Sequence, residues 1–252
     1  MKTDEVMCVL VVTNESFPKE NELKEKLIKE FPSIKTIVKN INKKNTNVIL
    51  GDKNIVIYGS GYITDKLGEY KFNISANSFY QINPVQTEKL YNLAIEGANL
   101  SKDDTVFDLY CGIGTIGIFA AKYAKKVYGI EIVEEAIKDA KENAKLNQID
   151  NIEFIAGDVE KLLDKLIYDK KIKPDVVFVD PPRKGLDTNT IENLLKIKPK
   201  KIVYISCNPA TLIRDLSKLE EKYDINEITP VDLFPYTSHV ECVTILKLKN
   251  SK

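Results

Sequence analysis

The chain has 252 residues, 43% of them hydrophobic and 29% charged, which suits a globular protein built as one large domain or one domain with a small companion. Its 37 basic and 37 acidic residues cancel, so no global charge attracts nucleic acid and RNA binding would need a local patch. No apolar run approaches the ~20 residues that span a bilayer. Because the first residues lack a signal-peptide pattern, we expect a cytoplasmic protein without membrane contact.

The cysteines and arginines are used sparingly. No C-x-x-C pair occurs, so we expect no zinc, iron–sulfur or other metal site. Of the 37 basic residues only Arg183 and Arg214 are arginines. A guanidinium differs from an ammonium chiefly where its planar fork is needed, so we expect both arginines at specific contacts. The four cysteines are Cys8, Cys111, Cys207 and Cys242.

The first part of the chain reads as short strands around one helix. An apolar run at 6–13 predicts a buried strand, and 19–30 has the periodicity of an amphipathic helix. Polar turns separate the strands that follow, and the last stretch is expected to complete the same sheet. These strands are expected at 34–40, 47–50, 55–58 and within 62–75. We therefore assign residues 1–75 to a small α+β subdomain.

From residue 76 onward strands alternate with helices. A helix is expected over 85–97, with Asn83 as its N-cap. Near-continuous apolar strands separated by helices indicate a parallel sheet covered on both faces. The strands are expected at 104–109, 126–131, 152–156, 175–180 and 201–206, and the helices at 115–124, 133–147, 158–168, 187–196 and 209–222.

The end of the chain departs from this alternation. Two late strands, 224–233 and 239–248, have no helix between them and are expected to pair antiparallel at one edge of the sheet. A parallel sheet closed in this way suits a Rossmann-like methyltransferase better than a dehydrogenase. We therefore predict the α/β class for residues 76–252, with parallel strands and a terminal antiparallel hairpin.

A glycine-rich turn follows the first strand of this sheet. The apolar run that contains Asp108 breaks at Gly112 and Gly114, and an apolar helix begins directly after them. Glycines let the backbone approach a ligand closely, and the helix start presents free N–H groups. The next strand ends in Glu131, which suits a pair of ribose hydroxyls. The pattern alone fits a dinucleotide as well as another nucleoside cofactor.

Two further polar stretches follow predicted strand ends, where a doubly wound sheet places its ligands. Cys207 precedes Asn208 and Pro209, a natural N-cap and first residue of a helix, so we expect its pKa to be lowered and its thiolate to be nucleophilic. The alternative is a small buried thiol. Asp180 is either a helix cap or a ligand group, and Arg183 beside it favours recognition of something planar or anionic.

Two more stretches hold candidate polar groups. His239 and Glu241 are two apart on the predicted last strand and should share a face, with Glu241 as the working group. Core packing explains Phe79 or Tyr80 before the 85–97 helix, but it does not explain Gln81.

Five motifs in order resemble those of the RNA uracil-C5 methyltransferases, which make 5-methyluridine in ribosomal and transfer RNA. The resemblance runs from about residue 6 to the end. The motifs are Phe79-Tyr-Gln-Ile-Asn83, Asp108-Leu-Tyr-Cys-Gly-Ile-Gly114, Asp180-Pro-Pro-Arg-Lys-Gly185, Ser206-Cys-Asn-Pro-Ala-Thr211 and His239-Val-Glu241.

The resemblance implies S-adenosyl-L-methionine as cofactor and RNA as partner, with 23S ribosomal RNA as the first expectation and transfer RNA as the second. It implies Cys207 as the nucleophile that forms an adduct with C6 of uracil, and Glu241 as the base. Asp180 and Arg183 would lie near the uracil. The residues assigned to the cofactor are Gln81, Tyr110, Gly112, Gly114, Glu131, Asp158 and Asp180.

Two alternatives remain at this stage. Members of the family usually begin with a small β-barrel RNA-binding domain and often carry iron–sulfur cysteines, so this chain looks like a truncated version. A non-catalytic fragment that binds S-adenosylmethionine or RNA is therefore the first alternative. A nicotinamide-dependent dehydrogenase is the second, although it would leave the Cys207 stretch and the terminal hairpin unexplained.

Overall fold

The computed structural model describes residues 2–250, except the side chain of Asn226. The chain divides into two compact units between Tyr80 and Gln81, a few residues beyond the predicted boundary at 75. None of the helices in the described residues is both long and apolar enough to span a membrane.

The first unit contains two small sheets, so the expectation of one sheet was wrong. The larger sheet has the order β1-β2-β3, with β1 parallel and β3 antiparallel to β2. The stretch 62–75 instead folds back on itself as a separate hairpin, β4-β5. The elements are β1 (Val6–Val12), α1 (Glu20–Glu30), β2 (Ile34–Ile41), β3 (Lys53–Tyr58), β4 (Tyr62–Leu67) and β5 (Tyr70–Ser75).

The strand expected at 47–50 does not form. These residues lie in the loop between β2 and β3, where Val48 and Ile49 are exposed. The side-chain amide of Asn42 donates to both of their carbonyl oxygens, at 2.8 and 2.9 Å. A side chain that binds local carbonyl groups in this way competes with sheet pairing, so the apolar pair is held in a loop.

The second unit is built on a seven-stranded sheet with the order β11-β12-β10-β9-β6-β7-β8. Strands β6 to β10 are parallel, whereas β12 runs antiparallel to both β10 and β11. The predicted α/β class and terminal hairpin are confirmed. The strands are β6 (Thr105–Leu109), β7 (Lys126–Glu131), β8 (Ile152–Ala156), β9 (Val176–Val179), β10 (Lys201–Ser206), β11 (Tyr223–Val231) and β12 (Glu241–Leu248).

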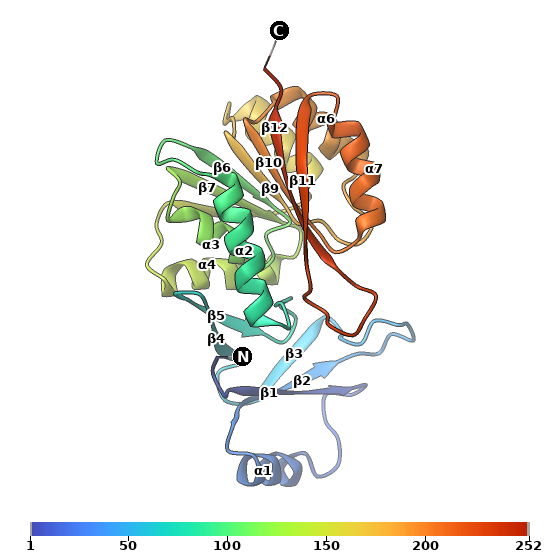
Figure 1. Cartoon of the computed structure of the whole chain (residues 1–252). Helices are drawn as coiled ribbons and strands as arrows, with labels where there is room; N and C mark the ends of the chain where they lie inside the picture. The colour runs from blue at the N-terminus through green and yellow to red at the C-terminus, as the bar shows by residue number, and fades with distance from the viewer. Residues whose placement is uncertain (1, 251–252) are drawn as a thin grey trace. The chain divides into compact units, whose positions relative to one another are not determined.

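Helices α2, α3 and α4 lie on one side of this sheet, and α6 and α7 lie on the other (Figure 1). Helix α5 packs against α6 and so belongs to the second side. The predicted helix at 158–168 is divided into α5 and a π-helical turn, η1. The helical elements are α2 (Pro84–Ala98), α3 (Thr115–Ala121), α4 (Glu134–Leu146), α5 (Val159–Asp164), η1 (Lys165–Asp169), α6 (Thr188–Ile197) and α7 (Pro209–Leu219).

The core follows the alternation of side chains along the strands. Phe107 and Leu109 of β6 pack into the cluster formed with α5, α6 and α7, so Asp108 between them points to the α3 side. The carboxyl ends of the parallel strands meet at one edge. The glycine turn, the Asp180 stretch and the Cys207 stretch all begin at that edge.

Asn83 begins α2 as predicted, since its side-chain oxygen accepts from the Gln86 N–H at 3.2 Å. Its amide also donates to the Leu233 carbonyl at 3.2 Å, which ties the start of α2 to the segment after β11. We predict that Asn83→Ala lowers the free energy of unfolding by about 1–2 kcal/mol. Asn83→Ser, which keeps a capping oxygen, should recover about half of that loss. Denaturant titration measures both, and equal stability of wild type and Asn83→Ala would contradict the assignment.

Candidate active site

Sheet register brings the separate motifs together at one edge. Leu109 of β6 pairs with Val179 of β9, and Val179 pairs with Tyr204 of β10. The residues that follow these strands therefore emerge side by side. On the other side of β10, Ser206 pairs with Cys242 of β12. Cys207 follows Ser206 and Glu241 precedes Cys242, so the antiparallel register brings these two residues next to each other. They are 34 positions apart in the sequence.

Asp108 binds the start of the helix that follows the glycine turn. This carboxylate is fully buried and accepts from the Gly117 N–H of α3 at 2.7 Å. Its second oxygen has no hydrogen-bond partner among the described residues. Burial raises the pKa of Asp108 to about 7. Asp108 was not among the predicted site residues, although an acidic residue inside an apolar strand is itself an indication of a functional site.

The turn is packed on its inner side and open on its outer side. Gly114 has φ +82°, and a Cβ there would come within 2.5 Å of the Phe154 ring. Gly112 has φ +52°, and a Cβ there would meet nothing within 4 Å. The positive φ explains why glycine stands at both positions. The open side at Gly112 is the place where a ligand could approach the backbone.

Glu131 closes the same turn from the neighbouring strand. One carboxylate oxygen accepts from the Gly112 N–H at 3.2 Å and the other from the Val133 N–H at 3.0 Å. The side chain is half-buried at the end of β7. Two backbone donors thus fix its orientation beside the open side of the turn. A carboxylate held in this way can accept hydrogen bonds from ribose hydroxyls, and this role of Glu131 stays a prediction.

Three other predicted cofactor residues have different surroundings. Tyr110, with φ +65°, donates its hydroxyl to Asp187 at 3.3 Å, and burial raises its pKa. Asp158 is the N-cap of α5 and accepts from the backbone of Glu160 at 2.9 Å. Gln81 is buried in the segment that leads into α2. The cofactor roles of Asp158 and Gln81 stay predictions.

Cys207, Glu241, Asp180 and Arg183 form a second group. Cys207 is half-buried and directly precedes the N-cap of α7, as predicted. The expected low pKa was wrong. Burial raises the pKa of the thiol, the Glu241 and Asp180 carboxylates raise it further, and only Arg183 among these side chains lowers it. The helix start is outweighed because remote parts of the chain bring two acids beside the sulfur.

The two carboxyl groups are perturbed as well. Glu241 is almost fully buried, and this burial raises its pKa from 4.5 to about 7, against the lowering effect of Arg183. Burial also raises the pKa of Asp180, and the charges of Glu241 and Asp108 add to the shift. A carboxyl group that titrates near neutral pH can accept and return a proton, which is the property of a general base.

His239 does not join this group. We expected it on the last strand, sharing a face with Glu241, but β12 begins at Glu241 and His239 lies exposed in the preceding loop. Its backbone N–H donates to the Thr237 hydroxyl at 3.2 Å, and its ring lies edge-on to Phe234 at 6.1 Å. These local contacts hold it in a turn, so the strand alternation that underlay the prediction does not apply.

The sheet order, the glycine turn and the edge that carries the cysteine and acids define a Rossmann-like methyltransferase fold. Pyrococcus abyssi Trm5b shares this fold, with a TM-score of 0.64 over 97% of this chain and 73% of that chain at 16% identity. The chain itself belongs to the tRNA (uracil-5-)-methyltransferase family, whose sequence profile matches residues 12–249.

Individual relatives agree with the family assignment. An uncharacterized RNA methyltransferase of Oceanobacillus iheyensis is 50% identical over 99% of this chain and 54% of its own length. One from Clostridium acetobutylicum is 51% identical over 98% and 54%. The chain thus spans about half the length of these relatives. The solved Pyrococcus abyssi tRNA (uracil-54, C5)-methyltransferase, in complex with S-adenosyl-L-homocysteine, matches with a TM-score of 0.76 at 32% identity over 96% of this chain and 56% of that chain.

The raised pKa of Glu241 predicts a pH-dependent effect on stability. Between its ordinary value of 4.5 and about 7, the folded protein keeps a proton that the unfolded chain has released, so this group's contribution falls as pH rises. Relative to wild type, Glu241→Gln should therefore gain stability between pH 5 and pH 8, by up to about 3 kcal/mol. Denaturant titration at both pH values measures the difference, and an identical offset at both would show that Glu241 is not perturbed.

Proposed function

We propose that this chain carries the catalytic unit of an S-adenosylmethionine-dependent RNA methyltransferase that modifies C5 of uracil. The observation that carries the proposal is the group formed by Cys207, Glu241, Asp180 and Arg183. It gathers at the sheet edge on which the glycine turn also lies, in a chain of the uracil-5-methyltransferase family. A nucleophile beside an acid of tuned pKa is what methylation at an unreactive ring carbon requires.

The glycine turn supports the cofactor part of the proposal. Gly112 has open space on its outer side, and Glu131 is oriented beside it by two backbone donors. The Asp108 oxygen that has no hydrogen-bond partner in the described part of the chain lies beside the same turn. These residues suit a nucleoside with a charged amino-acid tail, and when bound S-adenosylmethionine supplies the methyl group. A nicotinamide cofactor would leave the Cys207 group without a role.

The residues of this chain account for the chemistry of the base. C5 of uracil is a weak nucleophile, and addition of the Cys207 sulfur to C6 turns C5 into an enolate-like carbon. After the methyl group has been added at C5, the Glu241 carboxylate accepts the C5 proton. The bond between sulfur and C6 then breaks, and its electron pair returns to the sulfur as the C5–C6 double bond re-forms.

The charges around Cys207 determine when its thiolate forms. The Glu241 and Asp180 carboxylates oppose it, whereas Arg183 favours it. Glu241 must be ionised to act as the base, and its pKa of about 7 places that form in the neutral range. We therefore assign to Arg183 the role of stabilising negative charge on the Cys207 sulfur and on the uracil.

Ribosomal RNA is the first expected substrate and transfer RNA the second. The solved relative from Pyrococcus abyssi is named for uracil-54 of tRNA, which favours transfer RNA as the alternative. The target uracil must leave its stack to reach the sheet edge, which costs a few kcal/mol and favours a loop or a single strand. Mass spectrometry of both RNA classes from cells with and without the gene decides between them through the lost 5-methyluridine.

The cofactor assignment predicts a loss of affinity in Glu131→Ala. Removal of a charge-assisted hydrogen bond costs about 1.5–3 kcal/mol, so S-adenosylmethionine should bind about ten to a hundred times more weakly. Gly112→Ala should also weaken binding, because its methyl group enters the open side of the turn. Glu153→Ala, exposed on the adjacent strand, is the control. If calorimetry finds the same affinity for Glu131→Ala and the control, Glu131 is outside the cofactor site.

The covalent step predicts distinct outcomes for two variants. With RNA that contains 5-fluorouridine, no C5 proton is available to Glu241, so wild type should accumulate a methylated adduct. Cys207→Ala should lose trapping and turnover but keep S-adenosylmethionine affinity within about twofold, because the thiol acts on the base. Glu241→Gln should methylate and then stall, which accumulates an adduct even with ordinary uridine.

Gel shift and intact-mass spectrometry detect both adducts. Methylation by Cys207→Ala at the wild-type rate would refute covalent catalysis. Binding of S-adenosylmethionine and RNA by wild type with neither adduct nor product would identify the non-catalytic alternative.

A further inference from the structure

The stretch that carries Arg183 depends on helix α7 for its conformation. Between β9 and α6 the chain turns sharply, with the Gly185 N–H donating to the Pro182 carbonyl at 2.8 Å. Gly185 has φ +75°, and a Cβ there would come within 2.5 Å of an Asp215 oxygen and 2.6 Å of an Arg214 nitrogen. The turn therefore lies directly against these two side chains of α7.

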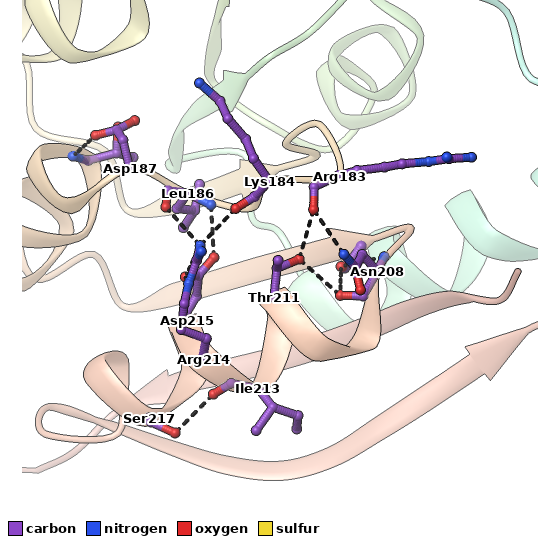
Figure 2. A network of polar contacts seen from close by, with 12 residues as sticks. Arg183, Lys184, Leu186, Asp187, Asn208, Thr211, Ile213, Arg214, Asp215 and Ser217 are labelled. Atoms are coloured by element: carbon purple, nitrogen blue, oxygen red, sulfur yellow. Dashed lines mark hydrogen bonds and ion pairs between the residues drawn. The ribbon is translucent and has the colours of Figure 1, made fainter.

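Helix α7 binds the carbonyl groups of this turn one after another (Figure 2). The Asn208 amide and the Thr211 hydroxyl both donate to the Arg183 carbonyl, at 3.0 and 3.2 Å. The Arg214 guanidinium donates to the Lys184 carbonyl at 2.9 Å and to the Leu186 carbonyl at 3.2 Å. These helix residues share one face, because they are three apart in sequence.

Asp215 connects this arrangement to the sheet. Its carboxylate is fully buried and accepts from the Leu186 N–H at 2.8 Å, from the Tyr204 hydroxyl of β10 at 2.8 Å and from the Arg214 Nε at 2.8 Å. A buried carboxylate is stable only when its oxygens are bonded in this way. The fork of Arg214 serves both the carboxylate and the turn, which a lysine cannot reproduce.

The Arg183 side chain itself points away from the Arg214–Asp215 pair (Figure 2). Asn208, which directly follows Cys207, donates to the Arg183 carbonyl at 3.0 Å, so Arg183 is held beside the Cys207 stretch. In agreement with this placement, the Arg183 charge lowers the pKa of both Cys207 and Glu241. Contacts to the backbone of this stretch hold it there, since Asn208 and α7 bind the Arg183 carbonyl and the carbonyls that follow.

We propose that Arg214 and Asp215 are positioning residues that hold the 182–186 turn, and with it the Arg183 guanidinium, beside Cys207 and Glu241. This proposal rests on the proposed function, in which the Cys207 thiolate is the nucleophile. Neither residue touches the reacting atoms. They act on the chemistry through the position of the Arg183 guanidinium. Loosening the turn should therefore weaken the stabilisation that this charge gives to the Cys207 thiolate against the Glu241 and Asp180 carboxylates.

The test measures the pH dependence of Cys207 alkylation, which needs neither RNA nor turnover. Iodoacetamide labelling of the full chain at Cys207, read by peptide mass spectrometry, gives a midpoint pH for the thiol. Arg214→Lys and Asp215→Asn should raise this midpoint by about 0.5–1 pH unit, a threefold to tenfold slower reaction below it. Lys218→Gln, exposed on the same helix, is the matched control and should leave the midpoint unchanged.

Arg183→Gln separates positioning from a general loss of structure. It should raise the midpoint by itself, and Arg214→Lys should add nothing further in the Arg183→Gln background, because the two act through one charge. A wild-type midpoint in Arg214→Lys, or the same shift in both backgrounds, would overturn the proposal. The Arg214 side chain is half-exposed, so Arg214→Lys should still fold. It therefore decides the test even if the fully buried Asp215→Asn change prevents folding. Absence of RNA methylation with these shifts present would refute the proposed function and leave this inference standing.

Discussion

The return of β12 alongside β10 is the constraint on which the candidate site depends. Because the two strands are antiparallel and Ser206 pairs with Cys242, the residue that leaves β10 faces the residue that enters β12. This register brings Cys207 and Glu241 together across a long stretch of chain. A slip of one residue would turn Glu241 to the other face of the sheet. The proposed nucleophile and the proposed base are therefore positioned by backbone pairing.

The electrostatics of the site follow from this crowding. A thiol and two carboxyl groups share the edge of the sheet, and burial raises the pKa of all three. Such a site is poor at holding a thiolate in the resting protein. It is well suited to proton transfer near neutral pH, because Glu241 has its pKa at about 7. Arg183 counters the acids, which gives the conformation of its turn a chemical role.

The parts of the structure that depend on local pattern could be predicted from the sequence. The alternation of strands and helices, the N-cap at Asn83 and the helix start after Cys207 all follow from propensity, capping and turn chemistry. The 62–75 hairpin was misassigned because periodicity predicts strands but not their partners. The 47–50 segment was misread because one asparagine side chain binds its carbonyls.

The parts that depend on distant residues could not be predicted. A helix start lowers a cysteine pKa, but the two acids that outweigh it come from other strands. The burial of Asp215 against Tyr204 and the 182–186 turn depends on residues far from it in the sequence, so it appears only once the chain has folded. The rarity of arginine was the one sequence signal that pointed to Arg214.

The most direct test of the account follows the hydrogen at C5 of the target uracil. RNA transcribed with uridine tritiated at C5 is incubated with the protein and S-adenosylmethionine, and both tritium in water and methyl groups in RNA are counted. If Cys207 activates C5 and Glu241 removes its proton, one tritium should be released for each methyl group transferred, and Cys207→Ala should release none. Methyl groups that accumulate in the RNA while the tritium stays at C5 would contradict the account.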